Sequence, residues 1–153
     1  MIYTDTHSDH YGGVKGVVTE EDVASRRTVI IAPAGFMDAL VSEWVIAGSA
    51  MGRRAQYQFG SSVPHGARGQ VDAGLGKIDS RGAAGGGSSF IAPTTYITRA
   101  VEPRTIDGVR FVFQLTPETE APAEIHFFLP QSKVLDLAEN GTHTMHNLRP
   151  TRP

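Results

Sequence analysis

Short apolar runs alternate with polar, helix-initiating residues at the start of the chain. Residues 1–4 favour a β-strand, and residues 29–32 form an apolar run that Pro33 ends, as is typical of a buried strand. Between the two runs, Thr19 precedes three acidic residues, 20–22, in the pattern of a capping box that opens a short helix. This order predicts a β–α–β beginning.

A longer amphipathic helix is expected over residues 35–59. Its apolar side chains recur at three- and four-residue steps, at Phe36, Leu40, Trp44, Ala47 and Met51. Such spacing places them on one face of a helix, which then packs against a core. We therefore predict that Trp44 is a core residue.

Glycine dominates the next segment, residues 60–89, which ends in Gly85-Gly86-Gly87-Ser88-Ser89. This composition supports neither a helix nor a long strand and predicts a loop excursion from the domain. A glycine-rich loop can also bind phosphate. No Gly-Lys-Ser/Thr sequence follows this one, so we do not expect a phosphate site.

The second half of the chain has the alternating pattern of β-strands. Residues 91–98 are expected to form a strand, Asp107-Gly108 is a hairpin signal, and apolar side chains occupy alternate positions over 109–115. Residues 125–129 and 134–137 predict a further strand pair. Together these segments predict a β-meander.

The densest polar cluster is Asp5-x-His7-x-Asp9-His10, four potential metal ligands within six residues. On an extended segment positions 5, 7 and 9 share one face, and a turn into a helix at His10 would bring its ring to the same place. The chain has no cysteine, so any metal must bind nitrogen and oxygen, a combination that borderline ions such as Zn²⁺ accept. The alternative to a metal site is a solvated polar turn with no ligand.

Together with Tyr11-Gly12-Gly13, this cluster resembles the His-x-His-x-Asp-His motif of the metallo-β-lactamase superfamily, and the whole chain is similar to the alkyl sulfatase branch. Five blocks in the same order carry the resemblance: residues 3–16, 51–55, 69–77, 119–124 and 138–147. It implies an α/β fold of the metallo-β-lactamase αββα-sandwich type, incomplete at both ends. Residues 1–153 would form one partial domain, with 60–89 as the loop excursion.

The resemblance also implies a binuclear zinc site. Asp5, His7 and Glu120 would hold one ion, Asp9-His10 would hold the second, and Glu139 would bridge the two. The implied activity is zinc-dependent hydrolysis of alkyl sulfate esters, such as dodecyl sulfate, to alcohol and sulfate by metal-bound hydroxide. The chain would thus be a sulfuric ester hydrolase, and whether this segment is active alone stays open.

Two further residues match those that bind the sulfate group in the family, Asn147 and Arg152. A guanidinium fork suits a tetrahedral oxyanion, but an arginine so close to the end of the sequence can equally be a frayed, exposed side chain. Both interpretations stay open.

This sequence departs from the family pattern at two ligands. Asp5 stands where the family has a histidine, which adds a negative charge and shortens the reach to the metal. The last family ligand, a downstream histidine, has no counterpart before Pro153. We therefore expect about one tightly held zinc ion instead of two.

The other histidines are expected outside the metal site. His126 falls in an expected strand as a core or edge residue, and His65 falls in the loop, in solvent. His143 and His146 are three residues apart on a helix expected over 142–148. We expect neither of them to bind metal.

The charge and hydropathy of the chain limit the kinds of molecule that it is expected to bind. The 153 residues carry 14 Lys+Arg and 16 Asp+Glu, a formal net charge of −2, so nothing favours nucleic acid. The longest apolar stretch, around residues 36–50, is interrupted by polar residues and predicts no membrane span. The expected partner is a small-molecule alkyl sulfate. The resemblance also implies a homodimer, formed through regions of the family that this sequence does not include.

Two other functions remain as alternatives. One is a superfamily hydrolase that acts on another ester, a lactam or a phosphodiester, and the other is a degenerate, inactive metal-binding fragment. No signal peptide is recognised in this segment. The compartment therefore stays open, and a periplasmic or secreted full-length protein is compatible with the sequence.

Overall fold

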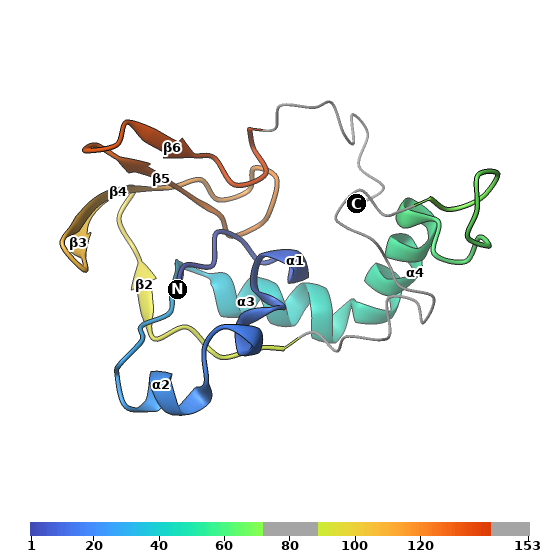
Figure 1. The fold of residues 1–153 in the computed structure, drawn as a ribbon, viewed down its shortest axis with the longest axis horizontal. Helices are drawn as coiled ribbons and strands as arrows, with labels where there is room; N and C mark the ends of the chain where they lie inside the picture. The colour runs from blue at the N-terminus through green and yellow to red at the C-terminus, as the bar shows by residue number, and fades with distance from the viewer. Residues whose placement is uncertain (72–88, 142–153) are drawn as a thin grey trace. The chain divides into compact units, whose positions relative to one another are not determined.

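The computed structural model describes residues 1–71 and 89–141 of this mixed α/β chain (Figure 1). Its described residues belong to two compact units, one made of residues 1–40 with 89–141 and one made of residues 41–71. Within these ranges, no helix combines the length and the apolar character that crossing a bilayer requires.

A small parallel sheet begins the first unit. β1 (Ile31–Pro33) pairs in parallel with β2 (Thr95–Ile97), and residues 1–3 run beside β1 through the bonds Ile31 N–H to Met1 O and Tyr3 N–H to Ile31 O, 3.0 and 2.9 Å. All three residues of β1 are buried, as expected of a parallel strand covered on both faces. The strands predicted at 29–32 and 91–98 are thus present, the second much shorter than expected.

Short helices follow the N-terminal segment. They are α1 (Ser8–Tyr11), a 3₁₀ turn (Val14–Gly16) and α2 (Glu20–Ala24). The capping box predicted at Thr19 is confirmed, because Asp22 N donates to Thr19 Oγ1 and Thr19 N donates to Asp22 Oδ2, each at 3.1 Å. Each bond satisfies a backbone N–H that the first turn leaves without a helical partner.

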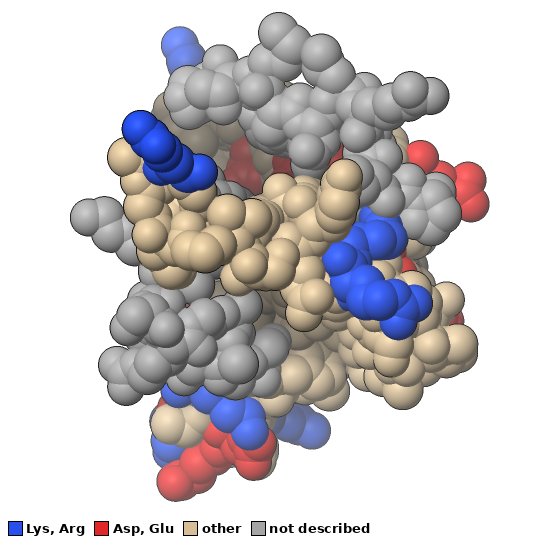
Figure 2. Space-filling model, turned by 90° about the vertical axis from the view of Figure 1, so that its right-hand side faces the viewer, with Lys and Arg blue, Asp and Glu red and all other residues tan. Residues whose placement is uncertain are grey.

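Charged side chains gather in small groups at the surface, with acidic and basic ones side by side in one group on the face shown in Figure 2. Around α2, Lys15 Nζ lies 2.6 Å from Glu20 Oε1, and Arg27 Nη2 lies 2.9 Å from Asp22 Oδ1. Exposed pairs of this kind contribute little to stability.

The predicted β-meander is confirmed for the strands after residue 100, but it does not include the strand predicted at 91–98, which pairs in parallel with β1 in the other sheet. β3 (Val101–Ile106), β4 (Val109–Leu115), β5 (Ile125–Leu129) and β6 (Val134–Asp136) form one antiparallel sheet in sequence order. Asp107-Gly108 joins the first two strands with φ angles of 49° and 79°. Positive φ at both positions is what a tight type I′ hairpin requires, and Asp-Gly tolerates it.

Two apolar clusters build the first unit. Ile31 and Ile97 of the parallel sheet pack with Phe113 and Ile125 of the meander. The second cluster is aromatic: the Tyr3 ring stacks on Phe36 at 5.5 Å between centroids and lies 5.9 Å from Tyr11. Since Tyr3 and Tyr11 flank residues 4–10, this cluster fixes both ends of the segment that carries the candidate ligands.

The continuous helix predicted over 35–59 is wrong. The first unit contains α3 (Phe36–Leu40), whereas the second contains a π-helical turn (Val41–Ile46) followed by α4 (Gly48–Phe59). The bond from Ala47 N to Ser42 O, 3.0 Å, closes the wider turn. A π-turn inserts one extra residue, so the apolar positions before and after it no longer share a face.

Trp44 is therefore not a core residue. It is only partly buried, and none of the described residues of α4 is fully buried. Gly60 ends α4 in a left-handed conformation, φ 62°, which glycine adopts without steric cost. Residues 60–71 form turns and one isolated bridge, His65 with Gln70, as predicted for a loop. Residues 72–88 of the predicted loop lie outside the described residues, and so does the helix predicted over 142–148.

Candidate metal centre

Residues 4–10 form a tight turn from extended backbone into α1. Asp5 is fully buried, and its Oδ1 accepts a 2.7 Å hydrogen bond from the backbone N–H of His7. This Asx turn redirects the chain, so that His7 ends the extended part and Asp9 and His10 lie on the helix. The predicted turn into a helix is present, but the helix begins earlier than expected, at Ser8, so Asp9 does not share an extended strip with residues 5 and 7.

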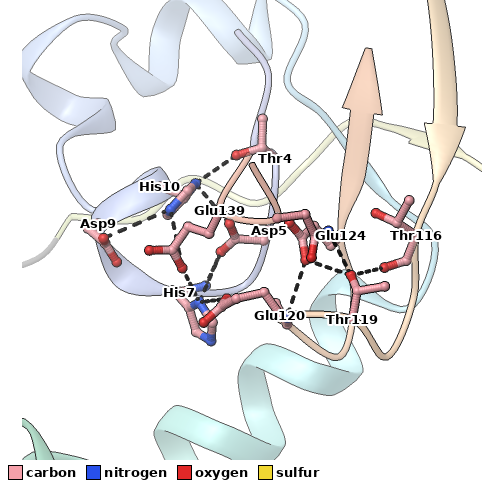
Figure 3. A network of polar contacts seen from close by, with 12 residues as sticks. Thr4, Asp5, His7, Asp9, His10, Thr116, Thr119, Glu120, Glu124 and Glu139 are labelled. Carbon is pink, nitrogen blue, oxygen red and sulfur yellow. Dashed lines mark hydrogen bonds and ion pairs between the residues drawn. The ribbon is translucent and has the colours of Figure 1, made fainter. Parts of the chain in front are cut away.

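Two glutamates distant in sequence reach His7. Glu120 lies in the connection between β4 and β5, and Glu139 lies just after β6. Glu120 Oε2 is 3.0 Å and Glu139 Oε2 is 3.1 Å from His7 Nδ1 (Figure 3). The His7 side chain is 2% exposed. The fold thus brings both predicted glutamates to the histidine motif.

His10 is held on both sides of its ring. Nδ1 lies 2.7 Å from Thr4 Oγ1 and 2.9 Å from Asp5 Oδ2. Nε2 faces Asp9 Oδ2 and Glu139 Oε2, each at 3.9 Å. The contacts at Nδ1 therefore leave Nε2 turned toward the other candidate ligands.

Two ligand triads result, and they share one carboxylate. Asp5, His7 and Glu139 form the first, and Asp9, His10 and Glu139 form the second, with donor atoms within 4.8 Å of one another in each. Glu139 therefore lies where a bridging ligand would. Glu120 contacts His7 but belongs to neither triad, so the geometry around His7 differs from the expected grouping of Asp5, His7 and Glu120.

The triads differ in exposure. Asp5 and His7 are 0% and 2% exposed, whereas Asp9 and His10 are 40% and 18% exposed. Two of the three ligands of the first triad are therefore shielded from water, whereas all three of the second are at least partly exposed, because Glu139, shared by both, is 22% exposed.

Charge is strongly coupled within the cluster. Burial lowers the pKa of His10, but its close contacts with the carboxylates of Asp5 and Glu139, together with the charges of Asp5 and Asp9, outweigh burial and raise the pKa to about 10. In return, His10 and His7 hold the pKa of Glu139 well below its usual range. A cation that binds His10 Nε2 must displace a proton, which makes metal binding dependent on pH.

The remaining predicted residues separate from the cluster. His126 is half-buried in β5, with its Nε2 2.9 Å from Asn140 Nδ2, and His65 is exposed. Asn147 and Arg152, predicted to bind sulfate, lie outside the described residues, as do His143 and His146.

One buried acid beside the site was not predicted. Glu124 is fully buried, and its Oε2 accepts hydrogen bonds from Thr119 Oγ1 at 2.9 Å and Ala121 N at 3.1 Å. The sequence held a weak signal for it, a second glutamate four residues after Glu120 at the start of an apolar strand. A charged residue at a strand end is usually exposed, which is why the pattern did not single it out.

No family model matches the chain. Over nearly its whole length, however, the chain is homologous to a segment of the alkyl sulfatases. It is 55% identical over 148 residues to the alkyl/aryl-sulfatase BDS1 of Saccharomyces cerevisiae and 45% identical over 148 residues to an (R)-specific secondary-alkylsulfatase of Pseudomonas sp..

A solved structure agrees with these relatives. The stereoselective inverting sec-alkylsulfatase Pisa1 from Pseudomonas sp. is similar with a TM-score of 0.84 at 44% identity, covering 95% of this chain and 23% of that one. The two sequence relatives are matched over 97% of this chain but only 22% of their own length. The chain thus spans about a fifth of these enzymes.

Proposed function

We propose that this chain carries the metal centre of a zinc-dependent alkyl sulfatase, which hydrolyses alkyl sulfate esters to alcohol and sulfate. The fold would be part of a metallo-β-lactamase-type αββα sandwich. The observation that supports the proposal most is the pair of ligand triads joined at Glu139, in a chain 55% identical to a named alkyl/aryl-sulfatase.

The donor set fits zinc. Ligands about 2.0–2.1 Å from a tetrahedral ion stand roughly 3.3 Å from one another, and the contacts of His7 Nδ1 with Glu139, Glu120 and Asp5 span 3.0–3.5 Å. Zinc bound there would supply Lewis acidity and lower the pKa of a coordinated water toward neutrality. Asp5, His7 and Glu139 would hold one ion, and the more exposed Asp9-His10 pair with Glu139 would hold another.

The surrounding residues orient these ligands. Thr4 and Asp5 hold His10 Nδ1 and so leave Nε2 for a metal. Asp5 contacts both histidines, because its Oδ2 lies beside His10 Nδ1 and its Oδ1 accepts a hydrogen bond from the backbone N–H of His7. Glu120, 22% exposed beside His7, would complete the coordination around the buried ion or hold the His7 ring in place.

The test is sulfate release from dodecyl sulfate, measured with and without added zinc beside a lactam and a phosphodiester. Since the chain spans about a fifth of its relatives, it is also exchanged for the matching segment of the yeast alkyl/aryl-sulfatase. We expect zinc-dependent sulfate release from the chimera and its loss on Glu139→Gln. A chimera that folds and binds zinc but releases no sulfate would contradict the proposed activity, and turnover of the lactam or phosphodiester alone would favour another superfamily hydrolase.

A further inference from the structure

Both glutamates of the site stand on irregular backbone. Glu120 lies in the β4–β5 connection and Glu139 in the turn that follows β6, yet both place Oε2 within 3.1 Å of His7 Nδ1. Loops alone rarely hold a ligand to the few tenths of an ångström that metal binding needs. Other contacts must therefore fix the two segments.

Glu124 contacts the residues on both sides of Glu120. Its Oε2 accepts from Ala121 N, 3.1 Å, and lies 2.9 Å from the hydroxyl of Thr119, whose one proton it shares with Thr116 O at 2.7 Å (Figure 3). The main chain of Glu124 forms an antiparallel bridge with Asp5. Glu124 thus ties the Glu120 loop to the N-terminal ligand segment.

Asn140 ties in the second glutamate. Its Nδ2 is 2.9 Å from Thr119 Oγ1 and 2.9 Å from His126 Nε2. A side-chain amide has two N–H groups and can donate to both acceptors at once. Since Asn140 directly follows Glu139, the Thr119 hydroxyl becomes the point where both glutamate segments meet.

Stability alone does not account for Glu124. The side chain is fully buried, and its Oε1 has no hydrogen-bond partner among the described residues. Burying a carboxylate oxygen without a partner costs stability. The hydrogen bonds that Glu124 accepts come from the two residues that flank Glu120, a candidate ligand. These bonds therefore help to hold Glu120 in position.

We propose that Glu124 and Asn140 are positioning residues of the metal centre: acting through Thr119, they hold Glu120 and Glu139 against His7 and so set the zinc affinity. This inference rests on the proposed function, because it assumes that zinc is the ion bound.

Zinc titration of the full 153-residue chain against a chromophoric chelator tests the proposal. We expect Asn140→Ala and Glu124→Leu to weaken zinc binding about 10- to 100-fold, the usual effect of losing a group that orients metal ligands. Glu124→Gln keeps an acceptor oxygen for Thr119 and Ala121 and should bind within a few-fold of the unsubstituted chain. Cobalt(II) absorption of the same variants reports whether the ligand geometry changes.

Gln131→Ala is the matched control, since it removes an exposed amide in the turn before β6. Asn140 is also exposed, so its variant should leave the melting temperature of the zinc-free chain unchanged, which keeps the test valid even if Glu124→Leu fails to fold. Unchanged zinc affinity in Asn140→Ala, or equal weakening in Glu124→Gln and Glu124→Leu, overturns the positioning role alone. An unsubstituted chain that binds no zinc overturns the proposed metal centre together with it.

Discussion

Glu139 is the residue on which both ligand triads depend, because one of its oxygens lies near His7 and His10 at once. Glu139→Gln removes the negative charge but keeps the shape, so we expect zinc affinity to fall at least about tenfold. Competitive zinc titration measures the effect, with the exposed Glu118→Gln as control. Equal affinity in both variants would show that Glu139 is not a ligand.

The raised pKa of His10 gives the metal-free chain a pH-dependent stability. The group titrates near 6.5 when unfolded and near 10 when folded. Its stabilising contribution is therefore complete below about pH 6.5 and disappears as the pH rises toward 10.

Urea unfolding in chelator, from pH 6 to pH 10, measures this contribution. We expect the unchanged chain to exceed His10→Gln in free energy of unfolding at pH 6 and the difference to shrink as the pH rises. A difference that stays constant over this range would contradict the charge coupling with Asp5 and Glu139.

The sequence pointed to residues that do lie together, although it grouped those around His7 differently, and their role as metal ligands stays a prediction. Asp5, His7, Asp9 and His10 were found because a six-residue motif is local. Glu120 and Glu139 were found only through resemblance, since their approach to His7 depends on the meander and not on any nearby pattern. Glu124 was missed because only the fold reveals that it is buried.

Among the elements, those defined by local chemistry were predicted best. Asp107-Gly108 fixes its hairpin by backbone preference and Thr19 opens α2 by its own hydrogen bond, so neither needs the rest of the fold. The helix expected over 35–59 failed because apolar spacing does not reveal a π-turn. The same spacing cannot show that the chain passes there from one compact unit into another.

Removing the side-chain cap of α2 should lower the stability of the chain. Thr19→Ala removes the side-chain acceptor for Asp22 N, and the loss of such a cap costs about 1 kcal/mol. Denaturant unfolding of the chain measures it, with Ser132→Ala in an exposed turn as control. A loss below about 0.3 kcal/mol would show that the first turn finds other partners for its N–H groups.

For the whole molecule, the two-sheet arrangement explains why ligands from three distant segments converge. The bridge between Asp5 and Glu124 and the bond from Ile125 N to Thr4 O, 2.8 Å, attach the histidine segment to the first residues of β5. In the meander, the connection between β4 and β5 carries Glu120, and the turn after β6 carries Glu139. The candidate metal centre thus depends on the tertiary structure as much as on the motif.

The two triads should not bind zinc equally. Asp5 and His7 are almost completely buried, whereas Asp9 is 40% exposed and lies 3.9 Å from its histidine. A buried, closely spaced set of ligands holds an ion more tightly than an exposed, widely spaced one, because its side chains have to move less when the ion binds.

Zinc content after exhaustive dialysis tests the central claim most directly. The chain is loaded with zinc, dialysed, and analysed for metal per polypeptide beside its Glu139→Gln variant. We predict about one retained ion in the unchanged chain and far less in the variant. Two retained ions would show that the exposed triad is stronger than its geometry suggests, and a folded chain that retains none would contradict the metal centre itself.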